Sequence, residues 1–587
     1  MNLVFDIEAN GLEPDKIFCM VAYDVDTRAT YKYDVDNLED GYRLLSSANK
    51  LIGHNILCYD IPVIKKIAGV DLSDKKIVDT LVLSRLFKPT REGGHGLESW
   101  GYRLNYNKGD YGESDEAWEA YCPEMLEYCE RDVLLNAKVY EALKLESRGF
   151  TPQSVRLEHA VATIVNTQRD NGFVLDVQKA MLLIAELTDK IEEVKREVHK
   201  EFKPRVTITE LYPKYTKAGV LSKLAEDFYG NGVRLTDEEW ETMNKTKKSL
   251  KRETSTEFNL GSRKQIGEYL IEFGWKPKNY TPTGQPIVDE GTLKKVTDIP
   301  QAQMIAHYLM LQKRLAQVNS WVKELNQDTG RIHGYVNPNG AVTSRMTHSH
   351  PNMAQIPSCS SPYGEDCRAC WTVPENHKLV GIDASGLELR MLAHYLEDED
   401  YTNEILNGDI HTANQKLAGL KSRNQAKTFI YALLYGAGDA KLGSVVGRNR
   451  AVGKELRQSF FDNLPSFKSL TSRVQREAKS GFIKGLDGRK ITVRSEHAAL
   501  NTLLQSAGAI VMKEALVVLD KKIKDSRLNA KFVANVHDEW QIECSNDHAD
   551  KVGELGVEAI VQAGLNLNLK CPLNGDYKVG SAWHETH

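Results

Sequence analysis

Alternation of apolar and polar residues predicts a strand-rich unit at the start of the chain. In LVFDIEA (3–9) the apolar residues repeat with a period of two, so Asp6 and Glu8 lie on the same face of one strand. The next apolar segments are typical of further strands and of a helix start, at 16–25, 30–35 and 51–67. This order of elements predicts an α/β unit over about the first 145 residues.

Apolar residues that recur every three or four positions predict long helices in the following segments. Residues 124–144 and 300–326 have this spacing. Residues 178–203 predict a long charged helix, whose apolar positions are Met181, Ile184, Leu187, Ile191 and Val194. The segment 204–284 is charged and turn-rich, and it contains the basic run Lys245, Lys247, Lys248, Lys251 and Arg252. Such a run is either a solvated helix face or a patch that follows a phosphate backbone.

Two segments far apart in the chain each bring an aspartate to the end of a predicted strand. KLVGIDASGLELRML (378–392) predicts a strand that ends at Asp383, a turn at Ser385-Gly386 and a helix that carries Glu388 and Arg390. KFVANVHDEWQIEC (531–544) predicts two strands with His537-Asp538-Glu539 near the tip between them. A hairpin tip can set Asp538 beside Asp383, although each acid taken alone is more often an ordinary turn residue.

A predicted helix between these segments carries cations and aromatic rings on one ridge. In SRNQAKTFIYALLYGAG (422–438), every fourth residue falls on a slowly drifting line, which contains Arg423, Lys427, Tyr431 and Tyr435. Cations followed by rings suit a triphosphate along one half of the ridge and a sugar and base along the other. The alternative is an amphipathic helix with two core tyrosines.

A further set of acids lies in the first 132 residues. Tyr128 and Asp132 are four residues apart on a predicted helix and therefore share a face. With Asp6, Glu8 and Asp60 from distant segments, this set of oxygen ligands can hold two divalent cations. Two such cations about 3.5–4 Å apart polarise a phosphate and activate a water, which Tyr128 would orient. Taken alone, the pair of acids in the first strand is weak support for a site.

Length and composition restrict the possibilities less than these patterns do. A chain of 587 residues predicts about four domains, and 41% hydrophobic with 27% charged residues is ordinary for a globular protein. There is no run of about 18 apolar residues, which predicts no membrane span. The acidic start MNLVFDIEANG is unlike a signal peptide and predicts a cytoplasmic protein. A net charge of −5 argues only weakly against a nucleic-acid partner, because acids concentrated in metal sites leave a basic groove possible.

The cysteines do not indicate a disulfide framework. There are nine, scattered along the chain and odd in number. Cys359, Cys367 and Cys370 form a cluster, but no fourth zinc ligand at suitable spacing is evident nearby. Reduced thiols are therefore the preferred interpretation, with a zinc site as the alternative.

Taken together, these motifs resemble two known families. Asp6, Glu8, Asp60, Tyr128 and Asp132 match the DEDDy exonucleases without a gap. The segments around Asp383, 423–438 and 537–539 are similar to motifs A, B and C of family A DNA polymerases, in particular those of T7-like bacteriophages. Further T7-like stretches are NPNGAVTSRMTHSHPNMAQIPS, SPYGEDCRA, GDIHTANQ and GLDGRKITVRSEHAALNTLLQSAGA. The resemblance covers nearly the whole chain and is weakest between about 190 and 257.

The resemblance implies a multidomain α/β (α+β) fold, in which an RNase H-like DEDDy 3′→5′ exonuclease domain precedes a right hand of palm, fingers and thumb. The implied order is the exonuclease domain, the start of the palm with the thumb, the palm with motif A, the fingers, and the palm with motif C. The corresponding ranges are 1–150, 151–325, 326–395, 396–510 and 511–587.

The resemblance also implies two Mg²⁺ ions in each active site, with Mn²⁺ as a substitute. In the polymerase site the implied metal ligands are Asp383, the Ala384 carbonyl and Asp538; in the exonuclease site they are Asp6, Glu8, Asp60 and Asp132. The implied contacts to dNTP phosphates are His411, Arg423 and Lys427, and Lys427 is also a candidate proton donor to pyrophosphate. Glu388 and Tyr431 would form the floor under the sugar, with Tyr435 near the templating base. Arg345, Gln505 and His537 would contact the minor groove of the primer-template.

Function and partners follow from the same resemblance. It implies a monomeric DNA-dependent DNA polymerase with proofreading, which replicates phage DNA in the cytoplasm of an infected bacterial host. Its expected partners are primer-template DNA, dNTPs, a phage helicase-primase and a single-stranded DNA-binding protein, without a membrane. Thioredoxin is doubtful, because 204–257 is shorter than the thioredoxin-binding insertion of the T7 enzyme and unlike it. Two alternatives are a single-subunit RNA polymerase and a catalytically idle DNA-binding scaffold.

Overall fold

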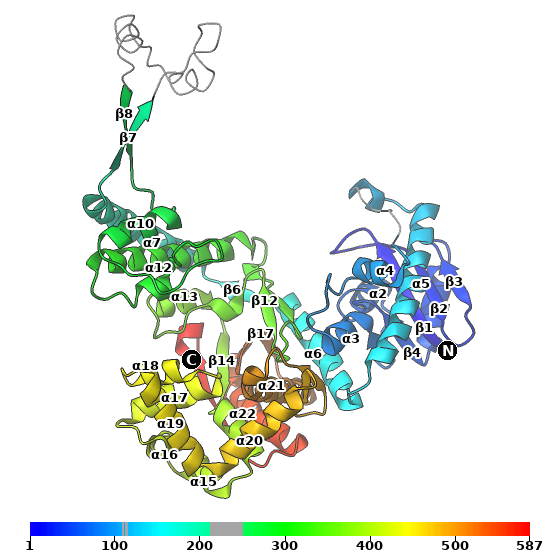
Figure 1. Cartoon of the computed structure of the whole chain (residues 1–587). Helices are drawn as coiled ribbons and strands as arrows, with labels where there is room; N and C mark the ends of the chain where they lie inside the picture. The colour runs from blue at the N-terminus through cyan, green and yellow to red at the C-terminus, as the bar shows by residue number, and fades with distance from the viewer. Residues whose placement is uncertain (109–110, 112–114, 212–249) are drawn as a thin grey trace, which may run out of the picture. The chain divides into compact units, whose positions relative to one another are not determined.

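The computed structural model describes residues 1–108, 111, 115–211 and 250–587 of the chain (Figure 1). The chain divides into two compact units. The first consists of Met1–Val177 together with Lys323–His587, and the second is Gln178–Val322. The second unit lies inside the predicted 151–325 segment but begins later, because residues 151–177 pack with the first unit.

The N-terminal part of the first unit is built on a five-stranded mixed sheet in the order β3-β2-β1-β4-β5. β1, β2 and β3 are antiparallel neighbours, whereas β4 runs parallel to both β1 and β5. The strands are β1 (Asn2–Ala9), β2 (Ile17–Asp24), β3 (Thr30–Tyr33), β4 (Lys50–Gly53) and β5 (Lys76–Asp79). The helices are α1 (Leu38–Ser47), α2 (Asp60–Ala68), α3 (Thr80–Phe87), α4 (Leu97–Leu104) and α5 (Pro123–Glu146).

Alternate residues of β1 face two different cores, which fixes the direction of its acids. Leu3, Phe5 and Ile7 pack in the core on the side of α1 and α2. Val4 packs in the core that contains Met125 and other residues of α5. Because side chains alternate across a strand, the residues that continue the Val4 face point toward α5. Those residues are Asp6 and Glu8.

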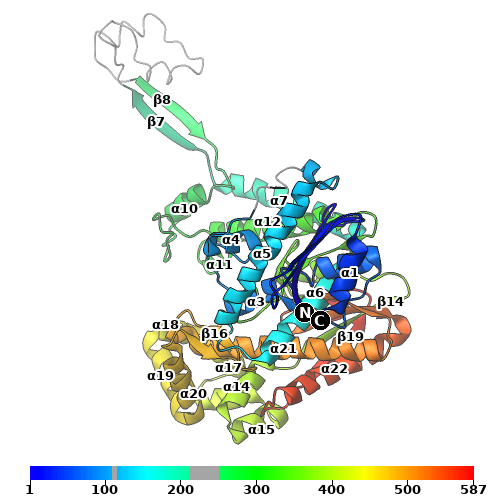
Figure 2. The ribbon, with the colours of Figure 1, turned by 90° about the vertical axis from the view of Figure 1, so that its right-hand side faces the viewer.

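A second sheet, of four antiparallel strands in the order β17-β18-β14-β19, forms the centre of the C-terminal part. Its strands are β14 (His377–Ala384), β17 (Ala530–Val536), β18 (Glu539–Ser545) and β19 (Gly575–Gly580). Two long helices, α21 (Ala499–Asp525) and α22 (Ala549–Asn566), lie side by side (Figure 2). A stretch of α21 is long and apolar enough to cross a membrane, but 72% of it is buried inside the molecule, as in a core helix.

A group of helices lies between β14 and α21 in the sequence and shares one core with them. Polar N-caps begin several of these helices: Asp398 caps α15, Asp409 caps α16 and Ser422 caps α17. The helices of this group are α14 (Leu387–Leu396), α15 (Glu399–Asn407), α16 (Ile410–Ala418), α17 (Arg423–Leu434), α18 (Asp439–Val445), α19 (Arg450–Asn463) and α20 (Pro465–Ala478).

Shorter elements complete the first unit. A small sheet has the order β13-β6-β10-β9, and two further strand pairs are β11-β12 and β15-β16. The strands are β6 (Phe173–Leu175), β9 (Leu325–Asn326), β10 (Arg331–Ile332), β11 (Tyr335–Asn337), β12 (Thr347–Ser349), β13 (Trp371–Thr372), β15 (Phe482–Lys484) and β16 (Lys490–Thr492). Among the described residues, the remaining α-helices of this unit are α6 (Pro152–Asn171) and α13 (Gly364–Ala369). α6 packs against α3 as well as against α21 and β17.

Outside residues 212–249, which the structure does not describe, the second unit contains three helices of two turns or more and an antiparallel hairpin. Its elements are α7 (Val177–Glu201), β7 (Arg205–Leu211), β8 (Leu250–Thr256), α10 (Arg263–Glu272), α11 (Glu290–Leu293) and α12 (Pro300–Lys323). The predicted helix at 178–203 is present, but one of its apolar positions was assigned to the wrong face. Met181 is 51% exposed, because the buried stripe begins at Ala180 and Leu183 and then runs through Leu187 and Ile191, two of the predicted positions. The basic run at 245–252 lies outside the residues whose side chains the structure describes.

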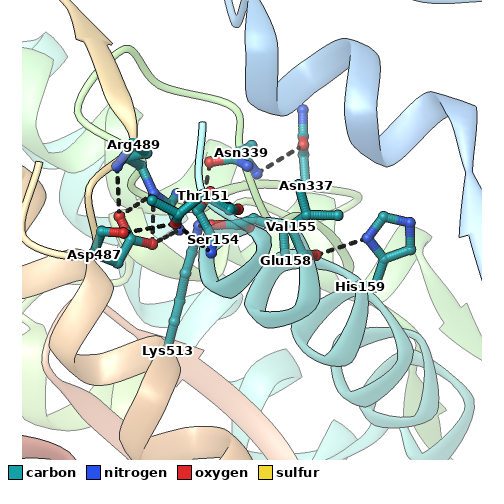
Figure 3. A network of polar contacts seen from close by, with 10 residues as sticks. All are labelled: Thr151, Ser154, Val155, Glu158, His159, Asn337, Asn339, Asp487, Arg489 and Lys513. Atoms are coloured by element: carbon teal, nitrogen blue, oxygen red, sulfur yellow. Dashed lines mark hydrogen bonds and ion pairs between the residues drawn. The ribbon is translucent and has the colours of Figure 1, made fainter. Parts of the chain in front are cut away.

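A buried network of four charges joins α6 to α21 and to the β15-β16 hairpin (Figure 3). Glu158 of α6 accepts hydrogen bonds from Lys513 Nζ at 2.8 and 2.9 Å and from an Arg489 guanidinium nitrogen at 2.5 Å. Arg489 also donates to both carboxylate oxygens of Asp487. The side chains of these four residues are at most 1% exposed. Two carboxylates therefore balance two cations in the interior, which limits the desolvation penalty of each.

Candidate active sites

The end of β14 and the tip of the β17-β18 hairpin bring two aspartates together. The hairpin turn consists of His537 and Asp538, and His537 adopts a left-handed backbone (φ 57°) that reverses the chain. The amide of Ala384 donates to the carbonyl of Asp538 at 3.1 Å, which ties the tip to the end of β14. Asp383 and Asp538 thus line the same cleft, as the strand pattern predicts.

The electrostatics of this pair favour a bound cation. Burial, and next the negative charge of Asp538, raise the pKa of Asp383 to about 7. A divalent cation would relieve this repulsion, and carboxylate and carbonyl oxygens are the ligands that Mg²⁺ prefers. Asp383, Asp538 and the Ala384 carbonyl therefore fit a metal site by the chemistry of their donors.

The cleft has a volume of about 460 Å³ and gathers most of the residues predicted for the polymerase site. All of its lining residues belong to the first compact unit. The predicted residues on its walls are Arg345, Asp383, Ala384, Glu388, Tyr431, Tyr435, Gln505, His537 and Asp538. They come from the β14 strand, the hairpin tip, α14, α17, α21 and the loop before β12.

Two tyrosines at the C-terminal end of α17 form one wall of the cleft. The rings of Tyr431 and Tyr435 are stacked, with centroids 6.5 Å apart and an interplanar angle of 26°. The helix ends at Leu434, so Tyr435 lies just beyond its last turn. Its hydroxyl donates to the carboxylate of Glu388, with distances of 2.8 and 3.0 Å to the two oxygens. Arg345 approaches the same carboxylate at 3.6 Å, which makes a continuous polar edge beside the rings.

The three predicted phosphate contacts lie outside the lining of the cleft. His411 is in the first turn of α16, and Arg423 and Lys427 are on the exposed side of α17. Arg423 Nε pairs with Asp409, the N-cap of α16, at 2.6 Å. The ring of His411 lies 6.4 Å from that of Tyr431, which links this basic surface to the wall of the cleft. Any phosphate that binds Arg423 must compete with Asp409.

Several residues of the cleft were missed by reasoning from sequence. Burial is the main reason that the pKa of His348 is lowered to about 4, and charge repulsion from His537 lowers it further. The ring of His348 is therefore neutral at pH 7. Lys513 joins the cleft to the buried charge network described above. No local pattern marks these residues, because their partners lie far away in the sequence. The missed lining residues with polar side chains are Ser344, His348, Lys513 and Asn535.

A second carboxylate cluster lies between β1, α2 and α5. Asp60, the first residue of α2, accepts a hydrogen bond from the amide of Ile7 at 3.1 Å. Oxygen atoms of Asp6 and Glu8 and the sulfur of Cys129 lie within 4.8 Å of one another. Cys129 is on α5 between Tyr128 and Asp132, so this helix brings the last predicted residues to the cluster. The five residues predicted for this site, Asp6, Glu8, Asp60, Tyr128 and Asp132, thus come from three elements.

Mutual repulsion and burial of the acids favour either their protonation or the binding of a positive charge. Burial, followed by neighbouring carboxylates, raises the pKa of Asp6 and of Glu8 well above the usual range. Burial is also the main reason that the pKa of Asp60 is raised to about 7. One oxygen of Asp132 is buried without a hydrogen-bond partner among the described residues. Divalent cations with oxygen ligands fit this donor set.

Lys108 is a further residue of the second cluster that the sequence did not indicate. Its ammonium pairs with Asp132 at 2.8 Å and lies 4.8 Å from the centre of the Tyr128 ring. Burial of the ammonium opposes its charge, but the adjacent Asp132 raises the pKa of Lys108 above its usual value. The lysine is therefore charged at neutral pH.

The proposed alternative of a zinc site around Cys359, Cys367 and Cys370 gains no support from the described residues. Cys370 Sγ donates to the carbonyl of Asp366, and Cys359 Sγ donates to that of His584. Over the ranges that the structure describes, the only Cys-containing group with the spacing of metal ligands is the one formed by Asp6, Glu8 and Cys129.

Comparisons with known proteins agree with this arrangement. Over 100% of both chains, the sequence is 35% identical to the DNA-directed DNA polymerases of Enterobacteria phage T3 and of Escherichia phage T7. A solved structure described as the POL domain of Pol1 from M. smegmatis in complex with DNA primer-template and dNTP superimposes with a TM-score of 0.78. That match covers 100% of this chain and 95% of the other, at 19% identity, and it shows the polymerase-domain fold with mixed helices and strands.

The family model of DNA polymerase family A matches residues 233–585, which is more than half of the chain. This range contains both aspartates of the cleft and the tyrosine wall. The chain therefore belongs to DNA polymerase family A and is a DNA-directed DNA polymerase similar to those of T7-like phages.

Proposed function

We propose that this polymerase combines two-metal nucleotidyl transfer at Asp383 and Asp538 with 3′→5′ proofreading at the cluster around Asp6. The observation that carries the proposal is the presence of two separate sets of buried or half-buried carboxylates, each in the first compact unit. The single-subunit RNA polymerase alternative disagrees with the family, and an idle scaffold would not maintain two sets of repelling acids.

In the synthetic site, the residues of the cleft hold the primer end and the nucleotide. Bound Mg²⁺, or Mn²⁺ in its place, would supply charge neutralisation and a lower pKa for the primer 3′-hydroxyl. Asp383, Asp538 and the Ala384 carbonyl would hold these ions. The hairpin contact between Ala384 and Asp538 keeps the two ligand-bearing segments in register, so the site is organised before substrate binds.

The remaining residues of the synthetic site divide between the phosphates, the sugar and the base pair. Arg423, Lys427 and His411 bind the triphosphate, and Lys427 is suited to protonate the leaving pyrophosphate. The Tyr431 ring and Glu388 form the floor under the sugar, and Tyr435 lies near the templating base. The minor-groove contacts fall to Arg345, Gln505 and His537, whose donors meet acceptors common to all correct pairs.

The excision site is proposed on its own geometry and fold. The sheet order β3-β2-β1-β4-β5, three antiparallel strands followed by two parallel ones, is that expected of an RNase H-like domain. Asp6, Glu8, Asp60 and Asp132 would hold divalent cations that polarise the scissile phosphate. Burial raises the pKa of Tyr128, so its phenol stays protonated and can donate a hydrogen bond to the attacking water.

The cellular setting follows from the similarity to the T3 and T7 enzymes. We expect the polymerase to replicate phage DNA in the cytoplasm of an infected bacterium, as a monomer on primer-template DNA. A phage helicase-primase and a single-stranded DNA-binding protein are the expected partners, whereas thioredoxin is not.

Primer extension with two variants tests both activities at once. Asp538→Ala should abolish synthesis and retain excision, whereas Asp6→Ala should retain synthesis and abolish excision, since each removes a ligand from one site only. Exposed acids offer matched controls: Asp525→Ala and Asp71→Ala break surface ion pairs with lysines and should change neither activity. If Asp538→Ala and Asp6→Ala each impaired both activities, the assignment of separate sites would be wrong.

A further inference from the structure

Lys108 makes two contacts in the exonuclease cluster at the same time. Its ammonium pairs with Asp132 Oδ2 at 2.8 Å. It also hydrogen-bonds the side chain of Tyr128 and lies 4.8 Å from the centre of that ring. The side chain of Asp132 is 5% exposed and that of Lys108 29% exposed, so the pair is largely withdrawn from solvent. One cation thus bridges two residues that stand one turn apart on α5.

The charge balance of the cluster gives this contact its importance. Asp6, Glu8, Asp60 and Asp132 bring up to four negative charges into a buried site. In the parts of the chain that the structure describes, Lys108 is the only lysine or arginine in an ion pair with any of these four carboxylates. Its charge also acts on Asp6 and Glu8, whose pKa values it lowers against the effects of burial and repulsion.

We propose that Lys108 is a positioning residue of the excision site, which holds Asp132 and Tyr128 in place and yields Asp132 to a divalent cation when one binds. This inference rests on the exonuclease proposed above. By donating to the phenolic oxygen of Tyr128, the ammonium leaves the phenolic hydrogen directed outward, where it can be donated to the attacking water. After Asp132 is released, the same lysine still fixes this orientation.

The proposal predicts effects of opposite sign on cation binding and on excision. The ammonium and a divalent cation compete for the same carboxylate, and they repel each other. Removing the lysine charge should therefore tighten cation binding by about tenfold, in line with the effect of a unit charge a few ångströms away. Excision should slow by about 10- to 100-fold in kcat, because Tyr128 loses its fixed orientation. If the lysine merely supported the fold, its removal would weaken cation binding and slow excision.

The test uses the full-length protein with the synthetic site disabled by Asp383→Asn and Asp538→Asn, so that cation binding reports on the second cluster. Mn²⁺ titration followed by electron paramagnetic resonance measures affinity, and hydrolysis of a single-stranded oligonucleotide measures kcat and KM. Lys108→Met is the diagnostic variant. Lys108→Arg should restore part of kcat and bring Mn²⁺ affinity back toward the parent. Lys138→Met is the matched control, because Lys138 of α5 lies over the Tyr106 ring, a comparable contact between a lysine and a tyrosine ring outside the carboxylate cluster.

The outcomes distinguish the positioning role of Lys108 from the exonuclease function on which it rests. Tighter Mn²⁺ binding with slower excision in Lys108→Met supports the positioning role. Weaker or unchanged binding in that variant overturns it, while an intact parent exonuclease would leave the proposed function standing. If Asp6→Ala changes neither Mn²⁺ binding nor excision in the parent, the exonuclease assignment fails, and the role of Lys108 fails with it. A melting temperature measured for each variant separates these results from unfolding.

Discussion

The buried charge network around Glu158 gives the prediction with the best-defined magnitude. Glu158→Gln keeps the size of the side chain and removes one negative charge from a fully buried group. It leaves Lys513 and Arg489 with only the carboxylate of Asp487 to balance them. The change therefore tests the electrostatic contribution of one residue to the attachment of α6 (Figure 3).

The contact distances set the size of the effect. At 2.5–2.9 Å and an effective dielectric constant of about 20, each cation attracts Glu158 by roughly 6 kcal/mol. Desolvation of the charges offsets much of this attraction, and loss of one partner from such a pair typically costs about 3–5 kcal/mol. Solvent screening does not reduce this figure, since the side chains are at most 1% exposed. We expect Glu158→Gln to lower the local unfolding free energy by that amount.

Hydrogen exchange at the backbone amides of α6 is the suitable assay, because a large chain of two units does not unfold in one step. A loss of about 3–5 kcal/mol corresponds to exchange that is faster by roughly 10²- to 10⁴-fold. Burial lowers the pKa of Lys513 to about 8 even with its partner present. Replacing this lysine as well, in Glu158→Gln with Lys513→Met, removes the unpaired cation and should recover most of the protection.

The control is an exposed pair on the same long helix. Lys522 of α21 pairs with Glu558 of α22 at 2.9 Å, and Glu558→Gln should change protection by less than about 1 kcal/mol. An effect of Glu158→Gln as small as that of this control would contradict a large contribution from the buried charges. Equally fast exchange in the double and the single variant would also contradict it, because the loss would then not arise from an uncompensated charge.

Three further predictions concern the two sites and the partners. The resemblance to family A polymerases implies that a tyrosine at 431 admits dideoxynucleotides, so Tyr431→Phe should discriminate against them more strongly than the wild type in primer-extension termination assays; equal discrimination contradicts this role. The pKa of Asp60 is raised by burial to about 7, whereas an unfolded aspartate titrates near pH 4. In EDTA, the contribution of Asp60 to stability should therefore be complete below about pH 4 and be lost as the pH rises to 7, and Asp60→Asn should flatten the change of melting temperature over this window; an unchanged slope contradicts the shift. Thioredoxin should leave the product-length distribution of primer extension unaltered, and a large increase in length would show that the chain binds it after all.

Local patterns in the sequence were sufficient to predict the elements that carry the acids. A period of two put Asp6 and Glu8 on one face of β1, and the structure shows that this face continues from Val4 toward α5. The strand, turn and helix around Asp383 were likewise predicted, since an apolar run followed by Ser-Gly is a strong signal. The exposed Met181 shows the limit of such patterns, because a charged helix offers more than one apolar stripe.

The sequence patterns were thus enough to predict the main strands and helices, the family, and the residue types that are suited to bind cations. The elements depend on residues close together in the sequence, and the family is identified from whole motifs. The ion pairs between charges that are distant in the sequence are apparent only in the folded structure. Glu158 pairs with Arg489 and Lys513, which are 331 and 355 positions away in the sequence. Lys108 reaches Asp132 from a loop that has no periodic pattern. Periodicity indicates which side of an element is buried, but it does not indicate which distant residue pairs with a buried charge. These pairings set the charge balance around the polymerase cleft and in the exonuclease cluster.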